Sequence, residues 1–138
     1  MLNRRHLRIK VLQVLYAYFQ SNEEDFRRTE KELMESVERI HDLYIYLLLT
    51  FSELKVVAEN RIEDLKKKIR PTEADLNPNL MFINNGLIQI LESSKELRRY
   101  SEARKVNWIG DENQEMFRKM FLQIKDSETY IQYVNSEA

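Results

Sequence analysis

The chain has 138 residues, 43% of them hydrophobic, and its 22 basic and 23 acidic residues give a net charge of −1 at neutral pH. This length is enough for one domain with a substantial core, and the balanced charge excludes a chain-wide attraction to nucleic acid, so that only a local basic patch can support such a function. Cysteine is absent, which excludes disulfides, thiolate metal sites and a thiol nucleophile and fits a cytoplasmic protein.

Helix is favoured along nearly the whole chain. Only two glycines and two prolines occur, while residues with strong helix propensity are abundant. The longest apolar run, LYIYLLL at 43–49, has seven residues, and a bilayer span needs roughly 18 to 20. We therefore expect an all-α protein, a bundle of four to five helices forming one domain over 1–138, with no membrane contact.

The first predicted helix starts from Asn3 as its N-cap and runs to about Gln20. At about 100° per residue its apolar side chains gather on one broad face. The members of this face are Leu7, Val11, Val14, Leu15 and Tyr18, widened by Leu12, Tyr16 and Phe19. We expect this face to pack into the core.

The segment from Glu23 to Arg70 contains no glycine or proline, and its apolar residues recur at helical spacings. One helix of this size would be roughly 70 Å long, so a kink near 40–42 that divides it in two is left open. The middle of the segment, LYIYLLLTF at 43–51, is apolar on all sides. We expect it to be the buried centre of the bundle.

The segment 71–78 is a predicted linker, because its two prolines interrupt the helical pattern. A third helix is predicted after Asn79. The Asn-Gly step at 85–86 is a strong turn signal, but apolar residues continue at helical spacing across it. We therefore expect the third helix to continue through this step.

The segment 93–110 is polar and aperiodic, and we expect a loop there, anchored by Trp108. Asp111 is predicted to cap a fourth helix that carries Phe117 and Phe121 on its inner face. A short fifth helix is predicted after Asp126.

Residue sets that could carry catalysis are missing from the sequence. Glu38 and His41 have the Glu-x-x-His spacing that places two metal ligands on one helix face, but a di-iron site needs a second such pair, and His6 has no Glu three residues before it. The serines lack a nucleophile elbow, and two isolated glycines cannot form a phosphate loop. We expect a protein without enzymatic activity, metal or cofactor.

Three basic clusters remain as candidates for binding. The cluster at 66–70 lies at the end of the long helical segment, where cations complement the negative end of the helix dipole. Arg98 and Arg99 lie beside Tyr100, a composition that suits RNA as well as a solvated loop. The third cluster is at the N-terminus.

Arg4, Arg5 and Arg8 form this third cluster, called the arginine cluster below. Arg4 and Arg8 fall within the arc occupied further along by apolar residues, so we expect them to project beyond the end of the core. Cations oppose the dipole at a helix N-terminus, whereas exposed N–H groups there suit phosphate. On physical grounds a phosphate site and a solubilising terminus are equal alternatives. His6 and Lys10 are additional basic contacts if phosphate binds.

The first helix carries the pattern Arg-Arg-x-x-Arg-x-x-x-Leu-Gln-x-Leu-Tyr. Its positions in this chain are Arg4, Arg5, Arg8, Leu12, Gln13, Leu15 and Tyr16. This pattern resembles the opening helix of the bacterial transcription antitermination factor NusB family. The resemblance implies an all-helical protein that binds the boxA element of nascent RNA together with a small-subunit ribosomal protein. It implies that the arginine cluster contacts RNA and that Leu12, Leu15 and Tyr16 lie in the core.

The resemblance is firm over 4–16 and looser to Ile69, and it implies a divergent relative or the N-terminal part of a longer NusB-like protein. Leu7 and Val11 stand where the family has alanines, which implies wider helix packing. The alternative function is a helical protein-interaction module. In that case the long second segment would pair with another helix or with a second copy, giving a homo-oligomer that does not bind RNA.

Overall fold

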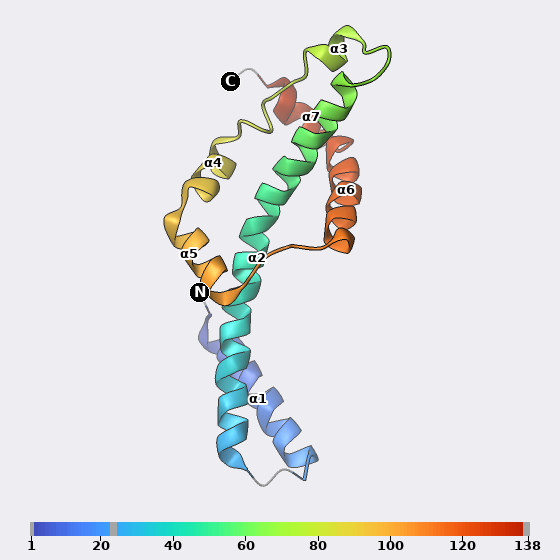
Figure 1. Ribbon diagram of the computed structural model, residues 1–138. Coiled ribbons are helices and arrows are strands. Elements are labelled where there is room, and N and C mark those ends of the chain that lie inside the picture. The colour runs from blue at the N-terminus through green and yellow to red at the C-terminus, as the bar shows by residue number, and fades with distance from the viewer. Residues whose placement is uncertain (1, 23–24, 137–138) are drawn as a thin grey trace. The chain divides into compact units, whose positions relative to one another are not determined.

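The computed structural model describes residues 2–22 and 25–136, and over these residues it is all-helical, with seven helices and no strand (Figure 1). The helices are α1 (Arg4–Gln20), α2 (Phe26–Lys66), α3 (Glu73–Leu76), α4 (Gly86–Ser93), α5 (Lys95–Arg104), α6 (Asp111–Lys125) and α7 (Glu128–Asn135). The all-α class and the very long helix are confirmed, whereas the expected four to five helices are too few. The chain divides into two compact units, unit 1 up to Tyr44 and unit 2 from Ile45 onward.

Helix α1 has the bounds that the sequence predicts. The side chain of Asn3 accepts a hydrogen bond from the His6 N–H at 3.0 Å, which satisfies one of the N–H groups left open at a helix start. At the other end Ser21 is extended, and its N–H donates to the Ala17 carbonyl. Local capping therefore explains both ends of this helix.

Helix α2 is 41 residues long, or about 60 Å. The predicted start at Glu23 lies outside the described residues, and the described helix begins after Asp25, whose carboxylate accepts a hydrogen bond from the Arg27 N–H at 3.0 Å. The helix runs without interruption through 40–42. The alternative of two separate helices is therefore wrong.

The apolar middle of α2 is not buried on all sides. Ile45 is 5% exposed, but Leu43, Tyr44 and Leu47 are 56%, 55% and 58% exposed. The expectation of a fully buried centre is wrong, because a face of a helix is buried only where a neighbouring element covers it. An all-round apolar sequence does not supply that neighbour.

Three helix starts in unit 2 differ from the sequence predictions, each for a local reason. Thr72 and Asp75 form a capping box that starts α3 inside the predicted linker. Asn85 caps α4 by accepting hydrogen bonds from the Leu87 and Ile88 N–H groups, so the Asn-Gly step begins this helix and does not lie within it. Ser94 caps α5, so the predicted loop is wrong over 95–104, whereas 105–110 are not helical, as predicted.

The last two helices follow the predictions closely. Helix α6 begins at Asp111, but the N-cap is Gly110, whose φ of +127° favours glycine. Asp111 is therefore an acidic residue of the first turn and not the cap. Ser127 caps α7 and accepts a hydrogen bond from the Tyr130 N–H at 3.3 Å.

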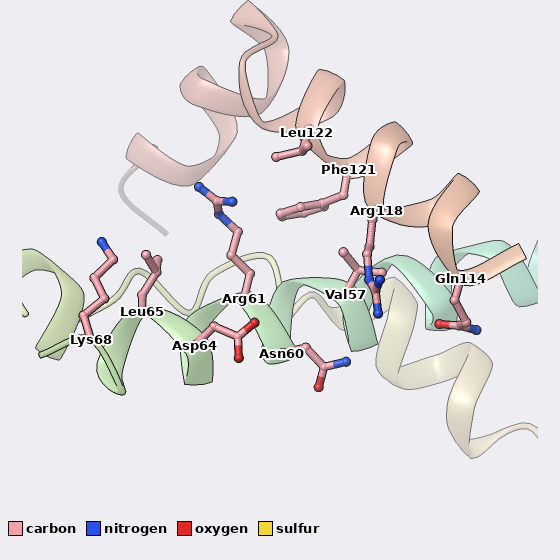
Figure 2. Close-up of a pocket in the computed structure, with 10 residues that line it drawn as sticks. All are labelled: Val57, Asn60, Arg61, Asp64, Leu65, Lys68, Gln114, Arg118, Phe121 and Leu122. Carbon is pink, nitrogen blue, oxygen red and sulfur yellow. The ribbon is translucent and has the colours of Figure 1, made fainter. Parts of the chain in front are cut away.

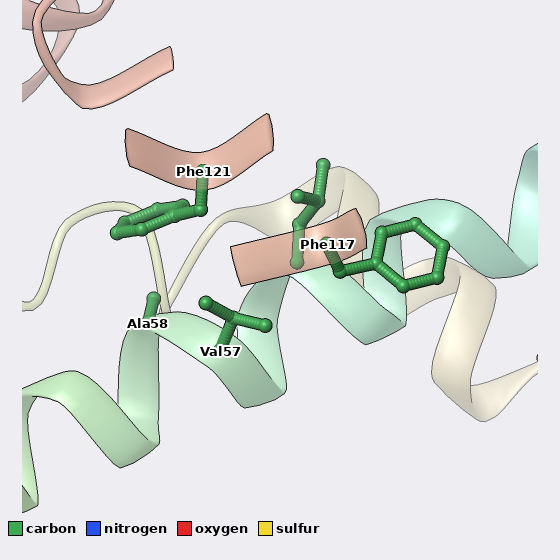
Figure 3. Close-up of a cluster of buried hydrophobic side chains, with 5 residues drawn as sticks. Val57, Ala58, Phe117 and Phe121 are labelled. Atoms are coloured by element: carbon green, nitrogen blue, oxygen red, sulfur yellow. The ribbon is translucent and has the colours of Figure 1, made fainter. Parts of the chain in front are cut away.

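The main core of unit 2 lies between α2 and α6 (Figure 3). Its buried members are Leu54, Val57 and Ala58 from α2 and Phe117 and Phe121 from α6. Trp108 packs edge-on against Phe117 with ring centroids 5.4 Å apart, and its indole N–H donates to the Tyr46 carbonyl at 2.9 Å. Trp108 is thus an anchor, as predicted.

A second core cluster of unit 2 joins α2, α5 and the segment after α5. Its buried members are Ile45, Leu97 and Val106.

Over the described residues, no helix has the combination of length and hydropathy that a bilayer span requires.

Candidate nucleic-acid interface

The arginine cluster occupies the first two turns of α1. All three side chains are exposed, and none of them forms an ion pair with any other described residue. The first turn of α1 contains no acidic residue. The predicted positive tip is therefore present, and its charge is not neutralised by described neighbours.

The apolar residues that follow the arginine cluster are also exposed. Leu12, Tyr16 and Phe19, called the α1 apolar face below, are 68%, 67% and 77% exposed. Leu15 is 36% exposed, and α1 has no buried residue. The core role that the resemblance implies for Leu12, Leu15 and Tyr16 is therefore wrong in this structure.

This exposure also changes the explanation of where the arginines lie. On a helical projection Arg8 is about 40° from Leu12 and about 20° from Phe19. The expectation was that Arg4 and Arg8 continue a buried face beyond the end of the core. Instead they continue an exposed apolar face, so cationic and apolar groups share one side of α1.

Helix α1 lies beside the first part of α2 within unit 1 (Figure 1). Val14 and Tyr18 are half-buried there, and the Tyr18 ring meets the Phe26 ring edge-on with centroids 6.1 Å apart. On α2, Thr29 is 6% exposed and donates a hydrogen bond to the Asp25 carbonyl. The hairpin is therefore joined along one narrow strip of side chains.

Both histidines line one pocket in unit 1. This pocket, called the histidine pocket below, has a volume of about 530 Å³, and its lining residues are Leu2, His6, Ile40, His41 and Tyr44. Sequence reasoning considered the two histidines separately and did not bring them together. The missing signal was the hairpin itself, since α1 ends at Gln20 and α2 starts at Phe26. Such a turn places positions near 6 opposite positions near 40.

Lys10, another predicted basic contact, is half-buried, whereas His6 is exposed. Lys10 lies one turn after His6 on the same flank of α1. Of the predicted contacts, His6 thus lines the histidine pocket. Lys10 and the arginine cluster belong to the same helix.

Arg98 and Arg99 belong to unit 2 and lie on α5, not in a loop. Both are exposed, and the Arg98 guanidinium donates to the Glu92 carbonyl at 3.2 Å. Tyr100 packs against the second core cluster of unit 2. Its ring therefore packs in the protein and is not presented to an RNA base.

The basic stretch at the end of α2 has structural partners. The Lys68 ammonium lies 3.3 Å from an Asp75 carboxylate oxygen. Hydrogen bonds from the Thr72 backbone and side chain, together with Lys68, lower the pKa of Asp75 below its ordinary value. Lys68 therefore helps to hold the turn into α3, in keeping with the structural reading of this cluster.

A second pocket, in unit 2, lies between α2 and α6 and has a volume of about 360 Å³ (Figure 2). Val57 and Phe121 form part of its apolar wall, and its cations are Arg61, Lys68 and Arg118. Two of these cations are paired, because Lys68 contacts Asp75 and Arg118 contacts Glu115 at 3.5 Å. The pocket therefore concentrates less positive charge than its lining suggests.

Within the part of the chain that the structure describes, no group of three or more potential metal ligands is found. Comparisons with protein-family models, with curated proteins and with solved structures give no match.

Proposed function

We propose that this protein is a non-enzymatic RNA-binding factor that holds single-stranded RNA on the N-terminal half of α1. The observation that carries the proposal is the arginine cluster, with three exposed guanidinium groups in two helical turns and no ion-pair partner among the described residues. Guanidinium groups bind phosphate oxygens in a bidentate manner. A cluster of three is suited to successive phosphates of one strand.

The sequence resemblance extends this proposal to a specific process. A factor of the NusB type would bind boxA-like RNA in the cytoplasm of a bacterium and favour processive transcription. In that setting a small-subunit ribosomal protein is the proposed partner. The α1 apolar face adjoins the arginine cluster and offers a surface of the kind that protein partners cover.

The test is a fluorescence-anisotropy titration of labelled boxA-like and scrambled RNA with the full chain. In the test variant Arg4, Arg5 and Arg8 are changed to alanine. In the control variant three exposed arginines of α2, Arg27, Arg28 and Arg39, are changed to alanine. Both variants lose three positive charges, so a difference between them reports position and not net charge.

We expect the test variant to lose most of its affinity and the control variant to keep it. Equal binding by the wild type and the test variant would contradict the proposal. Equal losses in both variants would mean that binding depends only on net charge, which would also contradict a site on α1.

A second candidate function is a helical protein-interaction module, and the α1 apolar face favours it. Three large apolar side chains, each more than 60% exposed, lie within eight residues of α1, and such clusters mark contact surfaces. On this account the protein forms a concentration-dependent homo-oligomer. Light scattering across a dilution series, with Leu12 and Phe19 changed to serine, separates the two functions, because RNA binding at the arginine cluster requires no oligomer.

A further inference from the structure

The histidine pocket lies where the start of α1 meets the middle of α2 within unit 1. Its volume of about 530 Å³ falls within the range of about 300–1,000 Å³ that is usual for small-molecule sites. Among the described residues, Leu2 and Ile40 supply aliphatic surface, and His6, His41 and Tyr44 also line the pocket. The pocket therefore combines an apolar wall with three planar rings.

The rings can contact a planar ligand. Tyr44 is 55% exposed, so its ring is not committed to a core. The His41 and Tyr44 rings have centroids 6.2 Å apart and are tilted by 51°, so they are not stacked face to face. Imidazole and phenol groups also offer hydrogen-bond donors and acceptors. Unpaired bases of single-stranded RNA are bound by this combination of aromatic faces and polar edges.

The charges around the pocket are unequal on its two sides. On α1, Arg5 precedes His6 directly and Lys10 follows one turn later. On α2, His41 is followed by Asp42 and preceded one turn earlier by Glu38. A nucleotide would therefore place its phosphate toward α1 and its base toward α2.

We propose that the histidine pocket binds one unstacked base of the RNA whose phosphates contact α1. This inference rests on the RNA-binding function proposed above and adds base contacts to it. Phosphate contacts position a strand but carry no sequence information, whereas base contacts supply it. The pocket is thus the part of the interface that distinguishes one RNA sequence from another.

The experiment compares two labelled oligomers of equal length in anisotropy titrations with the full chain. One is a single-stranded RNA, and the other is its abasic counterpart, which keeps the phosphates and lacks the bases. The pocket variant carries His41→Ala and Tyr44→Ala. The control is Leu43→Ala, which removes a 56% exposed apolar side chain of α2 that does not line the pocket.

We expect the pocket variant to bind the base-containing RNA about tenfold more weakly than the wild type, since stacking on one aromatic side chain is worth about 1–3 kcal/mol. Its affinity for the abasic oligomer should not change. The single variant Tyr44→Phe keeps the ring and should retain most of the affinity. Far-UV circular dichroism of each variant is the control for its helix content.

The outcomes separate the two proposals. The pocket inference is wrong, and the proposed function stands, if two results are found together. The pocket variant binds base-containing RNA as tightly as the wild type, and the variant with Arg4, Arg5 and Arg8 changed to alanine binds it more weakly. If the pocket variant loses affinity equally for both oligomers, the pocket does not contact a base. If wild type binds neither oligomer, both proposals are wrong.

Discussion

Unit 1 and unit 2 are built from the same kind of helix, but they treat their apolar residues in opposite ways. In unit 2, Phe117 is 0% exposed and Phe121 is 4% exposed, and aromatic rings surround them. In unit 1, α1 has no buried residue, and Phe19 is 77% exposed. Unit 2 therefore has a core of its own, whereas unit 1 presents apolar and cationic groups to its surroundings. This difference is the reason that the proposed binding surface is placed on unit 1.

The largest test of this comparison is the pair Phe117→Ala and Phe19→Ala. Removing a fully buried phenylalanine leaves a cavity and should lower the free energy of unfolding of unit 2 by about 3–5 kcal/mol. Removing the exposed Phe19 should change the stability by less than about 0.5 kcal/mol. Urea unfolding followed by fluorescence measures the loss in unit 2, because Trp108 is the only tryptophan and packs on Phe117. Far-UV circular dichroism in the same titrations measures the loss of helix in unit 1.

A large loss of stability from Phe19→Ala would contradict the comparison. It would mean that Phe19 is packed in a core, although its side chain is exposed. A small loss from Phe117→Ala would mean that unit 2 has no core of the kind described.

A smaller effect is expected from Asn3→Ala, which removes the cap of α1. The Asn3 side chain accepts the His6 N–H, and losing such a cap costs about 1 kcal/mol of helix stability. Because few contacts hold α1, we expect faster amide hydrogen exchange across its first turns and unchanged exchange in unit 2. Asn3→Asp keeps the acceptor and should behave as the wild type. If Asn3→Ala leaves amide hydrogen exchange in α1 unchanged, tertiary contacts and not the cap dominate the stability of this helix.

The smallest effect concerns the pair of Lys55 on α2 and Glu92 on α4, whose charged atoms are 2.6 Å apart. The hydrogen bond from Lys55 to Glu92 raises the pKa of Lys55 above its ordinary value of 10.5, and the charges of Glu92 and Glu59 add to this effect. A raised lysine pKa means that the stabilisation is complete below pH 10.5 and is lost as the pH rises through the folded-state pKa.

Glu92→Gln should therefore lower the stability of unit 2 by about 0.5–1 kcal/mol at neutral pH. The difference from the wild type should shrink above about pH 10.5. Urea midpoints at pH 7 and near pH 11 give the comparison. A difference that grows with pH would contradict the assigned role of this pair.

Sequence reasoning was most successful where the cause is local. The cap at Asn3 and the helix after Asp126 were predicted because one side chain satisfies backbone groups two or three residues away. The caps at Thr72 and Ser94 act in the same way. They were missed because proline and charge there suggested linker and loop more strongly than short helices.

The burial of a helix face by a neighbouring element could not be predicted from the sequence. Periodicity identified Leu12 and Tyr16 as apolar positions of α1, but no pattern within one helix states whether a neighbour will cover them. The same holds for positions 43–51, since only part of that apolar run is buried. The arginine cluster was predictable because its exposure follows from its charge. The histidine pocket was not, because it needs the pairing of α1 with α2.

The central claim is that the arginine cluster binds phosphates of single-stranded RNA, and salt dependence tests it most directly. Each phosphate contact with a single strand contributes about −0.7 to the slope of log K against log salt, so three contacts predict a slope of about −2. The variant with Arg4, Arg5 and Arg8 changed to alanine should bind with a slope near zero. An equal slope for the variant and the wild type would contradict the claim.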